Sequence, residues 1–90
     1  MAGNIYFVTA LTNAEAVKNR LEILISDDER CELAPGQWLV VYEGDPTDLA
    51  DAAGIRSGDG ALGTGLALKL TSYSGRMPAS SWDWLKTRIR

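Results

Sequence analysis

The segment over residues 4–11, NIYFVTAL, most constrains the fold because both of its faces are apolar. In an extended strand, Ile5 and Phe7 lie on one face, and Tyr6 and Val8 lie on the other. β-Branched and aromatic residues favour a strand here, and a strand that is apolar on both faces is typical of the middle of a sheet. The sequence therefore predicts a central strand that other elements cover on one or both sides.

Helix and strand signals alternate along the rest of the chain. Residues 12–15, TNAE, match a capping box, and Val17, Leu21 and Leu24 follow at helical spacing. Two strand-like runs, 30–33 and 37–43, are joined by Ala-Pro-Gly, which predicts a hairpin. These signals predict a helix followed by two paired strands.

The second half of the chain repeats these signals. Asp45 is placed to cap a second helix, with Pro46 at its first position. A glycine-rich loop, 57–65, then leads into an alternating strand over 66–73, and a capping box at Ser80 opens a last helix. Residues 58–63 match G-x-G-x-x-G, but they follow a helix and open a strand, so they do not predict a dinucleotide site.

The order β-α-β-β-α-β predicts an α+β fold with the ferredoxin-like split βαβ topology over a single domain, 1–90. Four antiparallel strands would carry two helices on one face, and the last helix is an addition. We expect a core that includes Phe7, Leu21, Leu24, Val40, Leu68 and Leu70. Tyr6, Val8 and Trp38 are predicted to lie on the open sheet face, covered by a second copy or by the last helix. Trp84 has two interpretations, an exposed interface residue or packing against the hairpin.

Composition excludes several classes of function. The 90 residues include no histidine, which rules out catalytic relays and zinc sites that depend on it. The lone Cys31 forms no internal disulfide and is interpreted as a buried structural thiol in a reducing compartment. No apolar run approaches the roughly 20 residues of a membrane span, and no export signal begins the chain. We therefore expect a cytoplasmic protein that does not enter a membrane.

Charged residues give weak signals for a site. The 12 acids against 9 bases argue against avid nucleic-acid binding. Cations near the C-terminus suit the helix dipole, or they form a small phosphate-facing patch made of Lys69, Arg76, Lys86 and Arg88. The acidic groups at 27–29 and 45–51 are interpreted as a solvated turn and a helix cap. We expect no metal site and no cofactor.

Four segments carry a resemblance to a known family: residues 6–9, 37–40, 73–75 and 82–86, read as YFVT, QWLV, YSG and WDWLK. The chain resembles the SinR-like relatives of the small CRISPR-associated adaptor and nuclease, the second Cas protein. The resemblance implies a ferredoxin-like homodimer whose sheets face each other across a two-fold axis. Dimers of this family bind duplex nucleic acid or partner proteins, and some members are metal-dependent nucleases.

The sequence departs from the family at the position that matters for hydrolysis. Family nucleases carry an aspartate at the end of the first strand, whereas this chain has Ala10 and Leu11 there. We therefore expect a non-catalytic homodimeric binding or scaffolding protein that contacts nucleic acid or a protein partner. The alternative is a metal-dependent endoribonuclease or endodeoxyribonuclease that uses acids elsewhere, such as Asp27, Asp28 or Asp45.

Overall fold

A computed structural model describes residues 3–56, 60–72 and 74–88, and it has the predicted mixture of helices and strands. The elements follow one another as β1 (Asn4–Ala10), α1 (Ala14–Leu24), the 3-10 turn η1 (Asp27–Glu29), β2 (Arg30–Ala34), β3 (Gln37–Tyr42), α2 (Pro46–Ala53), β4 (Gly65–Lys69) and α3 (Ala79–Arg88). None of the described helices is long and apolar enough to cross a membrane.

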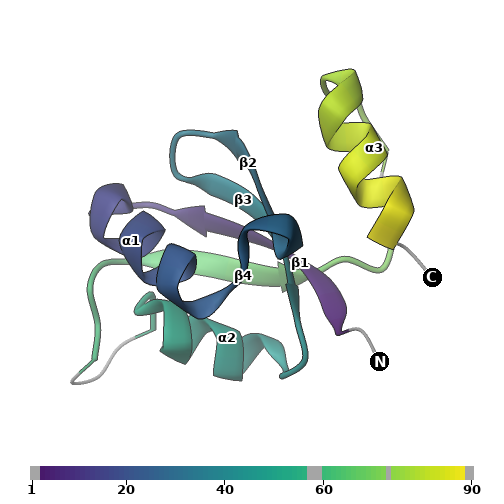
Figure 1. Cartoon of the computed structure of the whole chain (residues 1–90). Coiled ribbons are helices and arrows are strands. Elements are labelled where there is room, and N and C mark those ends of the chain that lie inside the picture. The colour runs from purple at the N-terminus through teal and green to yellow at the C-terminus, as the bar shows by residue number, and fades with distance from the viewer. Residues whose placement is uncertain (1–2, 57–59, 73, 89–90) are drawn as a thin grey trace.

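The four strands form one antiparallel sheet in the order β2-β3-β1-β4 (Figure 1). β1 lies inside the sheet, as its two apolar faces predict, and Phe7 stands opposite Leu39 of β3 and Leu68 of β4. β2 and β3 form the predicted hairpin, in which Gly36 adopts a left-handed φ of 82° that suits glycine. The α+β class and the four-stranded antiparallel sheet are thus confirmed.

The start of α1 differs from the predicted capping box. The N-cap is Asn13, in a left-handed conformation and without a side-chain cap hydrogen bond. The Thr12 hydroxyl instead accepts a 3.0 Å hydrogen bond from the Thr64 backbone N–H, and the Asn13 side-chain amide donates to the Leu62 carbonyl at 2.6 Å. These two residues therefore tie the start of α1 to the loop before β4.

The start of α2 matches the prediction. The Asp45 carboxylate accepts from the Asp48 backbone N–H at 2.9 Å, and the Asp48 carboxylate accepts from the Asp45 backbone N–H at 3.4 Å. This reciprocal pair is a capping box, and Gly54 closes the helix with a left-handed φ of 81°. The last helix begins at Ala79, so Ser80 lies inside its first turn rather than at its cap. β4 ends at Lys69, before the predicted end at residue 73, which lies outside the described residues.

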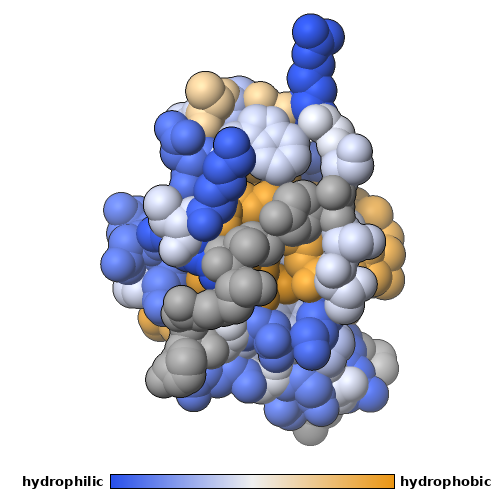
Figure 2. Space-filling view, turned by 90° about the vertical axis from the view of Figure 1, so that its right-hand side faces the viewer, coloured by the Kyte–Doolittle hydropathy of each residue, from blue (hydrophilic) through white to orange (hydrophobic). Residues whose placement is uncertain are grey.

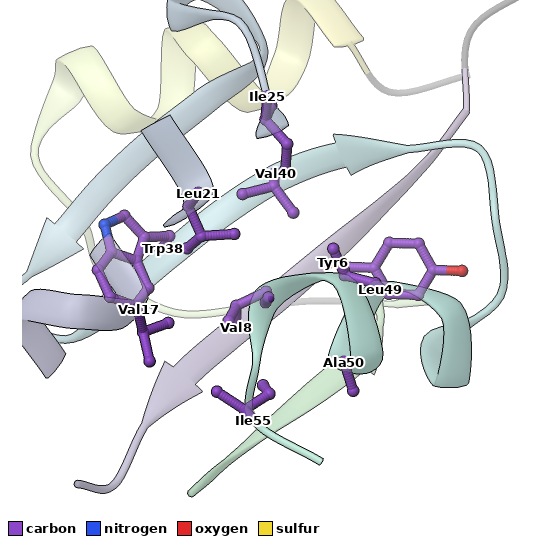
Figure 3. Close-up of a cluster of buried hydrophobic side chains, with 11 residues drawn as sticks. Tyr6, Val8, Val17, Leu21, Ile25, Trp38, Val40, Leu49, Ala50 and Ile55 are labelled. Carbon is purple, nitrogen blue, oxygen red and sulfur yellow. The ribbon is translucent and has the colours of Figure 1, made fainter. Parts of the chain in front are cut away.

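The main core lies between the sheet and helices α1 and α2 (Figure 3). Tyr6, Val8 and Trp38 belong to it, with 0%, 0% and 3% of their surface exposed. The prediction that these three side chains lie on the open sheet face is wrong, because α1 and α2 pack on the face that they occupy. Both faces of β1 are apolar, so the sequence alone does not tell which of them the helices cover.

The predicted core residues divide into three groups. Leu21 and Val40 are fully buried, as predicted. Phe7 and Leu70 are partly buried against the opposite face of the sheet. Leu24 and Leu68 were predicted in the core, but 38% and 50% of their surfaces are exposed, so that prediction is wrong for both.

Candidate interaction surface

The sheet face opposite α1 and α2 carries a second hydrophobic cluster, built against α3. Ile5, Leu39 and Val41 are buried there against Leu85 of α3. Because side chains alternate along a strand, Ile5 and Leu39 point away from the face that Tyr6 and Val8 occupy. In Figure 1, α3 stands apart from α1 and α2, and it packs mainly against β2.

Trp84 and Arg88 hold α3 onto the segment that precedes β2. The Trp84 indole N–H donates to the backbone carbonyl of Asp28 at 3.1 Å, and the Arg88 guanidinium donates to the same carbonyl. The guanidinium also lies over the Trp84 ring, 4.5 Å from its centroid. Trp84 is half-buried in the second cluster, so the structure favours packing near the hairpin over an exposed interface residue.

Between α3 and the sheet lies an apolar hollow of about 160 Å³. Its walls include Phe7, Leu39 and Leu70 from the sheet side, and Met77, Trp82 and Leu85 from α3 and the segment before it. Helix α3 therefore does not seal this face of the sheet in the way that α1 and α2 seal the other.

From Phe7 in the wall of the hollow, the apolar side chains of Leu66 and Leu68 continue across the same face toward the edge of the sheet. Leu66 and Leu68 of β4 are 52% and 50% exposed, and Leu68 stands opposite the half-buried Phe7 of β1. We call Phe7, Leu66 and Leu68 the leucine strip. Figure 2 shows hydrophobic surface in the middle of one side of the molecule, with hydrophilic residues to its left and below it. Leu66 and Leu68 are the large hydrophobic residues that the described strands leave exposed.

The leucine strip is the site that the sequence reasoning missed. The regular alternation of Leu66, Leu68 and Leu70 was a correct signal that they share one face. The alternation predicts Leu68 and Leu70 in the core, because an edge strand and an inner strand give the same pattern. The alternation therefore predicts that these leucines share one face of the sheet, but it does not predict that Leu66 and Leu68 are exposed.

The four basic residues predicted as a phosphate-facing patch do not all lie on one side of the sheet. Lys69 stands opposite Tyr6 and therefore points to the α1 and α2 side of the sheet, whereas Lys86 and Arg88 lie on α3 over the other side. Arg88 donates hydrogen bonds to the carbonyls of Trp84 and Asp28. Arg76 is exposed in the segment before α3. Lys69 therefore lies apart from the cations of α3, and nucleic-acid binding by these four residues stays a prediction.

A second cavity, of about 270 Å³, lies beside α1 and β2 and is lined by charges of both signs. Arg30 pairs with Asp27 there at 3.3 Å, and its buried Nε has no hydrogen-bond partner. Lys18, Glu22 and Glu32 complete the charged lining, so three acids face two bases. This balance opposes the binding of an anion, and the acids are not gathered around one point.

Two further sequence features gain a structural setting. Cys31 is partly buried on β2, and its Sγ lies 4.0 Å from the Ser81 hydroxyl of α3. The first part of the glycine motif, Gly58 and Asp59, lies outside the described residues, and the part that follows leads into β4 rather than into a helix. Within the ranges that the structure describes, no group of three or more Cys, Asp or Glu residues could hold a metal ion.

Comparisons with known proteins add no relative to this picture. No protein-family model, curated protein or solved structure matches the chain. The resemblance to the CRISPR-associated adaptor family therefore stays a prediction from the sequence.

Proposed function

We propose that this chain is a small non-catalytic binding or scaffolding protein of the cytoplasm that works as a homodimer. The observation that carries the proposal is the leucine strip, where Leu66 and Leu68 each leave about half of their surface exposed on one face of the sheet. A contiguous apolar patch on a small domain typically marks an interaction site. Covering it yields about 25 cal/mol for each Å² of apolar surface removed from water.

The proposal includes a ferredoxin-like fold and a relationship to the CRISPR-associated adaptor family. The antiparallel order β2-β3-β1-β4, with α1 and α2 packed together on one face, supports the ferredoxin-like topology. The aromatic and apolar residues of β1 and β3 support the family relationship, and they also form the core. The family's expected use of such dimers is to bind nucleic acid or a protein partner.

A protein partner suits the charges better than a nucleic acid. The net charge is −3, so a dimer would carry −6, and Lys69 and Lys86 lie on opposite sides of the sheet. Nucleic-acid binding depends on several cations that neutralise phosphates together. A mobility-shift titration on duplex DNA and RNA at two salt concentrations tests this part, and we expect no shift at physiological salt.

Sedimentation equilibrium at micromolar protein tests the homodimer. We expect the wild-type chain to sediment as a dimer and the double variant Leu66→Ser/Leu68→Ser to sediment as a monomer. Ile23→Ser is the matched control, because Ile23 is 83% exposed on α1, away from the leucine strip. A wild-type chain that stays monomeric at every concentration would overturn the proposal.

A further inference from the structure

Strand β4 is an edge strand, and some of its backbone N–H and C=O groups point away from β1. The sheet order places β4 at one side, with β1 as its neighbour within the described part of the chain. An open strand edge presents unpaired N–H and C=O groups that can add another strand. Which residues present them follows from the hydrogen bonds between β1 and β4.

The hydrogen bonds at both ends of the β1–β4 pair fix that pattern. The Leu70 N–H donates to the Ile5 carbonyl at 2.8 Å, and the Leu11 N–H donates to the Thr64 carbonyl at 2.7 Å. In an antiparallel pair, hydrogen-bonded and non-hydrogen-bonded residue pairs alternate. The even-numbered residues of β4 therefore bond to β1, and the backbone groups of Gly65, Ala67 and Lys69 point outward.

We infer that β4 pairs with β4 of a second copy in antiparallel register, centred on Ala67, so that two sheets join into one of eight strands. This inference rests on the proposed homodimer and specifies its geometry. The outward-pointing residues then meet one another, because Ala67 faces Ala67 of the second copy and Gly65 faces its Lys69. A two-fold axis perpendicular to the sheet relates the copies, unlike the face-to-face arrangement that the family resemblance implies.

The side chains of β4 favour this register over its neighbours. Each Leu66 stands opposite Leu68 of the other copy, so both leucine strips join into one apolar surface on the α3 side of the sheet. A register shifted by two residues toward the N-terminal end pairs Leu66 with Leu66 alone and so matches fewer leucines. A register shifted by two residues toward the C-terminal end relies on Leu70, which lies beyond the last residue of β4. A shift of four residues toward the C-terminal end places the two Lys69 ammonium groups opposite each other, which is unfavourable.

The charge of β4 does not oppose a second copy as the occupant. Lys69 is the one charged residue of β4, and in the inferred register it stands opposite a glycine. The two Lys69 residues are then offset by four positions along the strands, about 13 Å at the usual rise of a strand, which exceeds the screening length of about 8 Å at physiological salt. The strand therefore meets itself without like-charge repulsion and with its leucines matched.

The substitution Ala67→Pro tests the edge pairing directly. Proline is tolerated on edge strands where the missing N–H faces solvent, and the Ala67 N–H points away from β1. We expect Ala67→Pro to retain the circular dichroism spectrum of the wild type and to sediment as a monomer. Ala67→Ser keeps the N–H and is the matched control, which we expect to remain a dimer.

Variants with a single cysteine on β4, in a Cys31→Ser background, test the register by disulfide cross-linking. They also test the edge pairing itself if Ala67→Pro does not fold. Facing residues of a hydrogen-bonded pair have Cα atoms about 5.5 Å apart, which a disulfide can bridge. We expect Ala67→Cys to form a cross-linked dimer on mild oxidation, and Leu66→Cys and Leu68→Cys to remain largely uncross-linked. The reverse pattern, or a dimer that survives Ala67→Pro, would overturn the edge pairing while the homodimer stands. A wild-type chain that never dimerises would overturn both proposals.

Discussion

The two faces of the sheet are built from alternate residues of the same strands, yet they differ in how completely they are covered. On the side of α1 and α2, Tyr6, Val8 and Val40 have no exposed surface. On the side of α3, Leu39 is buried, whereas Leu68 is half-exposed. Two helices cover the first face and one helix covers part of the second. One face therefore supplies most of the stability, and the other carries the surface that we propose for self-association.

The largest expected effect lies on the covered face. Leu21 is fully buried in the main core, and truncation of a buried leucine to alanine typically costs about 2–5 kcal/mol. We expect Leu21→Ala to lower the free energy of unfolding by that amount, measured by urea denaturation. Ile23→Ala, on the exposed side of the same helix, should leave it nearly unchanged. Equal effects of the two changes would contradict the packing of α1.

Tyr6→Phe sharpens the comparison at the polar end of the same face. The buried Tyr6 hydroxyl donates to the Gly44 carbonyl at 2.6 Å, and loss of such a bond costs about 1 kcal/mol. Urea denaturation at neutral pH should show this loss. An unchanged denaturation midpoint would mean that the hydroxyl is satisfied equally well in the unfolded chain.

The same residue predicts a dependence on pH. Burial raises the pKa of the Tyr6 phenol above its ordinary value of 10.0, and the carboxylates of Asp45 and Asp48 raise it further. Above pH 10 the unfolded chain releases this proton before the folded chain does, so stability falls as the pH rises. We expect the fall between pH 9 and 11 to be shallower in Tyr6→Phe than in the wild type. Parallel curves would remove Tyr6 from this explanation.

Trp84→Phe probes how firmly α3 is held on the second face. The change keeps an aromatic ring but removes the hydrogen bond from the indole to the Asp28 carbonyl, which is worth about 1 kcal/mol. We expect faster amide hydrogen exchange in α3 and unchanged exchange in α1, because α1 packs on the other face of the sheet. Faster exchange in both helices would show that the two faces do not open separately.

The smallest effect is expected at Leu68. Because half of its surface is already exposed, Leu68→Ala removes less burial than Leu21→Ala does, and we expect a loss of about 1 kcal/mol or less at protein concentrations where the chain is monomeric. At higher concentration the gap between the variant and the wild type should widen, since binding of a second copy stabilises only the folded chain. A gap that does not depend on concentration would separate Leu68 from self-association.

The sequence predicted the types of element, but not how the faces of the sheet are used. The hairpin at Gly36 and the cap at Asp45 were predictable, because local turn and capping chemistry determines both. The placement of Tyr6 and Val8 was not predictable, since β1 is apolar on both faces. The Thr12 capping box failed because a contact with Thr64, distant in the sequence, takes up the hydroxyl.

The candidate site was harder to predict than the fold. The exposure of Leu66 and Leu68 depends on two facts that pattern does not contain: β4 lies at an edge of the sheet, and α3 reaches only part of that face. Likewise, the spacing of Lys69 and Lys86 along the chain says nothing about the side of the sheet on which each one lies. Tertiary placement decided both outcomes.

The central claim is that two copies meet along β4, so that Leu66 of one copy lies beside Leu68 of the other. Isotope-filtered NMR on a mixture of carbon-13-labelled and unlabelled chains tests it most directly, because this experiment reports only contacts between different copies. The account predicts nuclear Overhauser effects between the methyl groups of Leu66 in one copy and Leu68 in the other. An absence of intermolecular signals from either leucine, in a sample that sediments as a dimer, would contradict it.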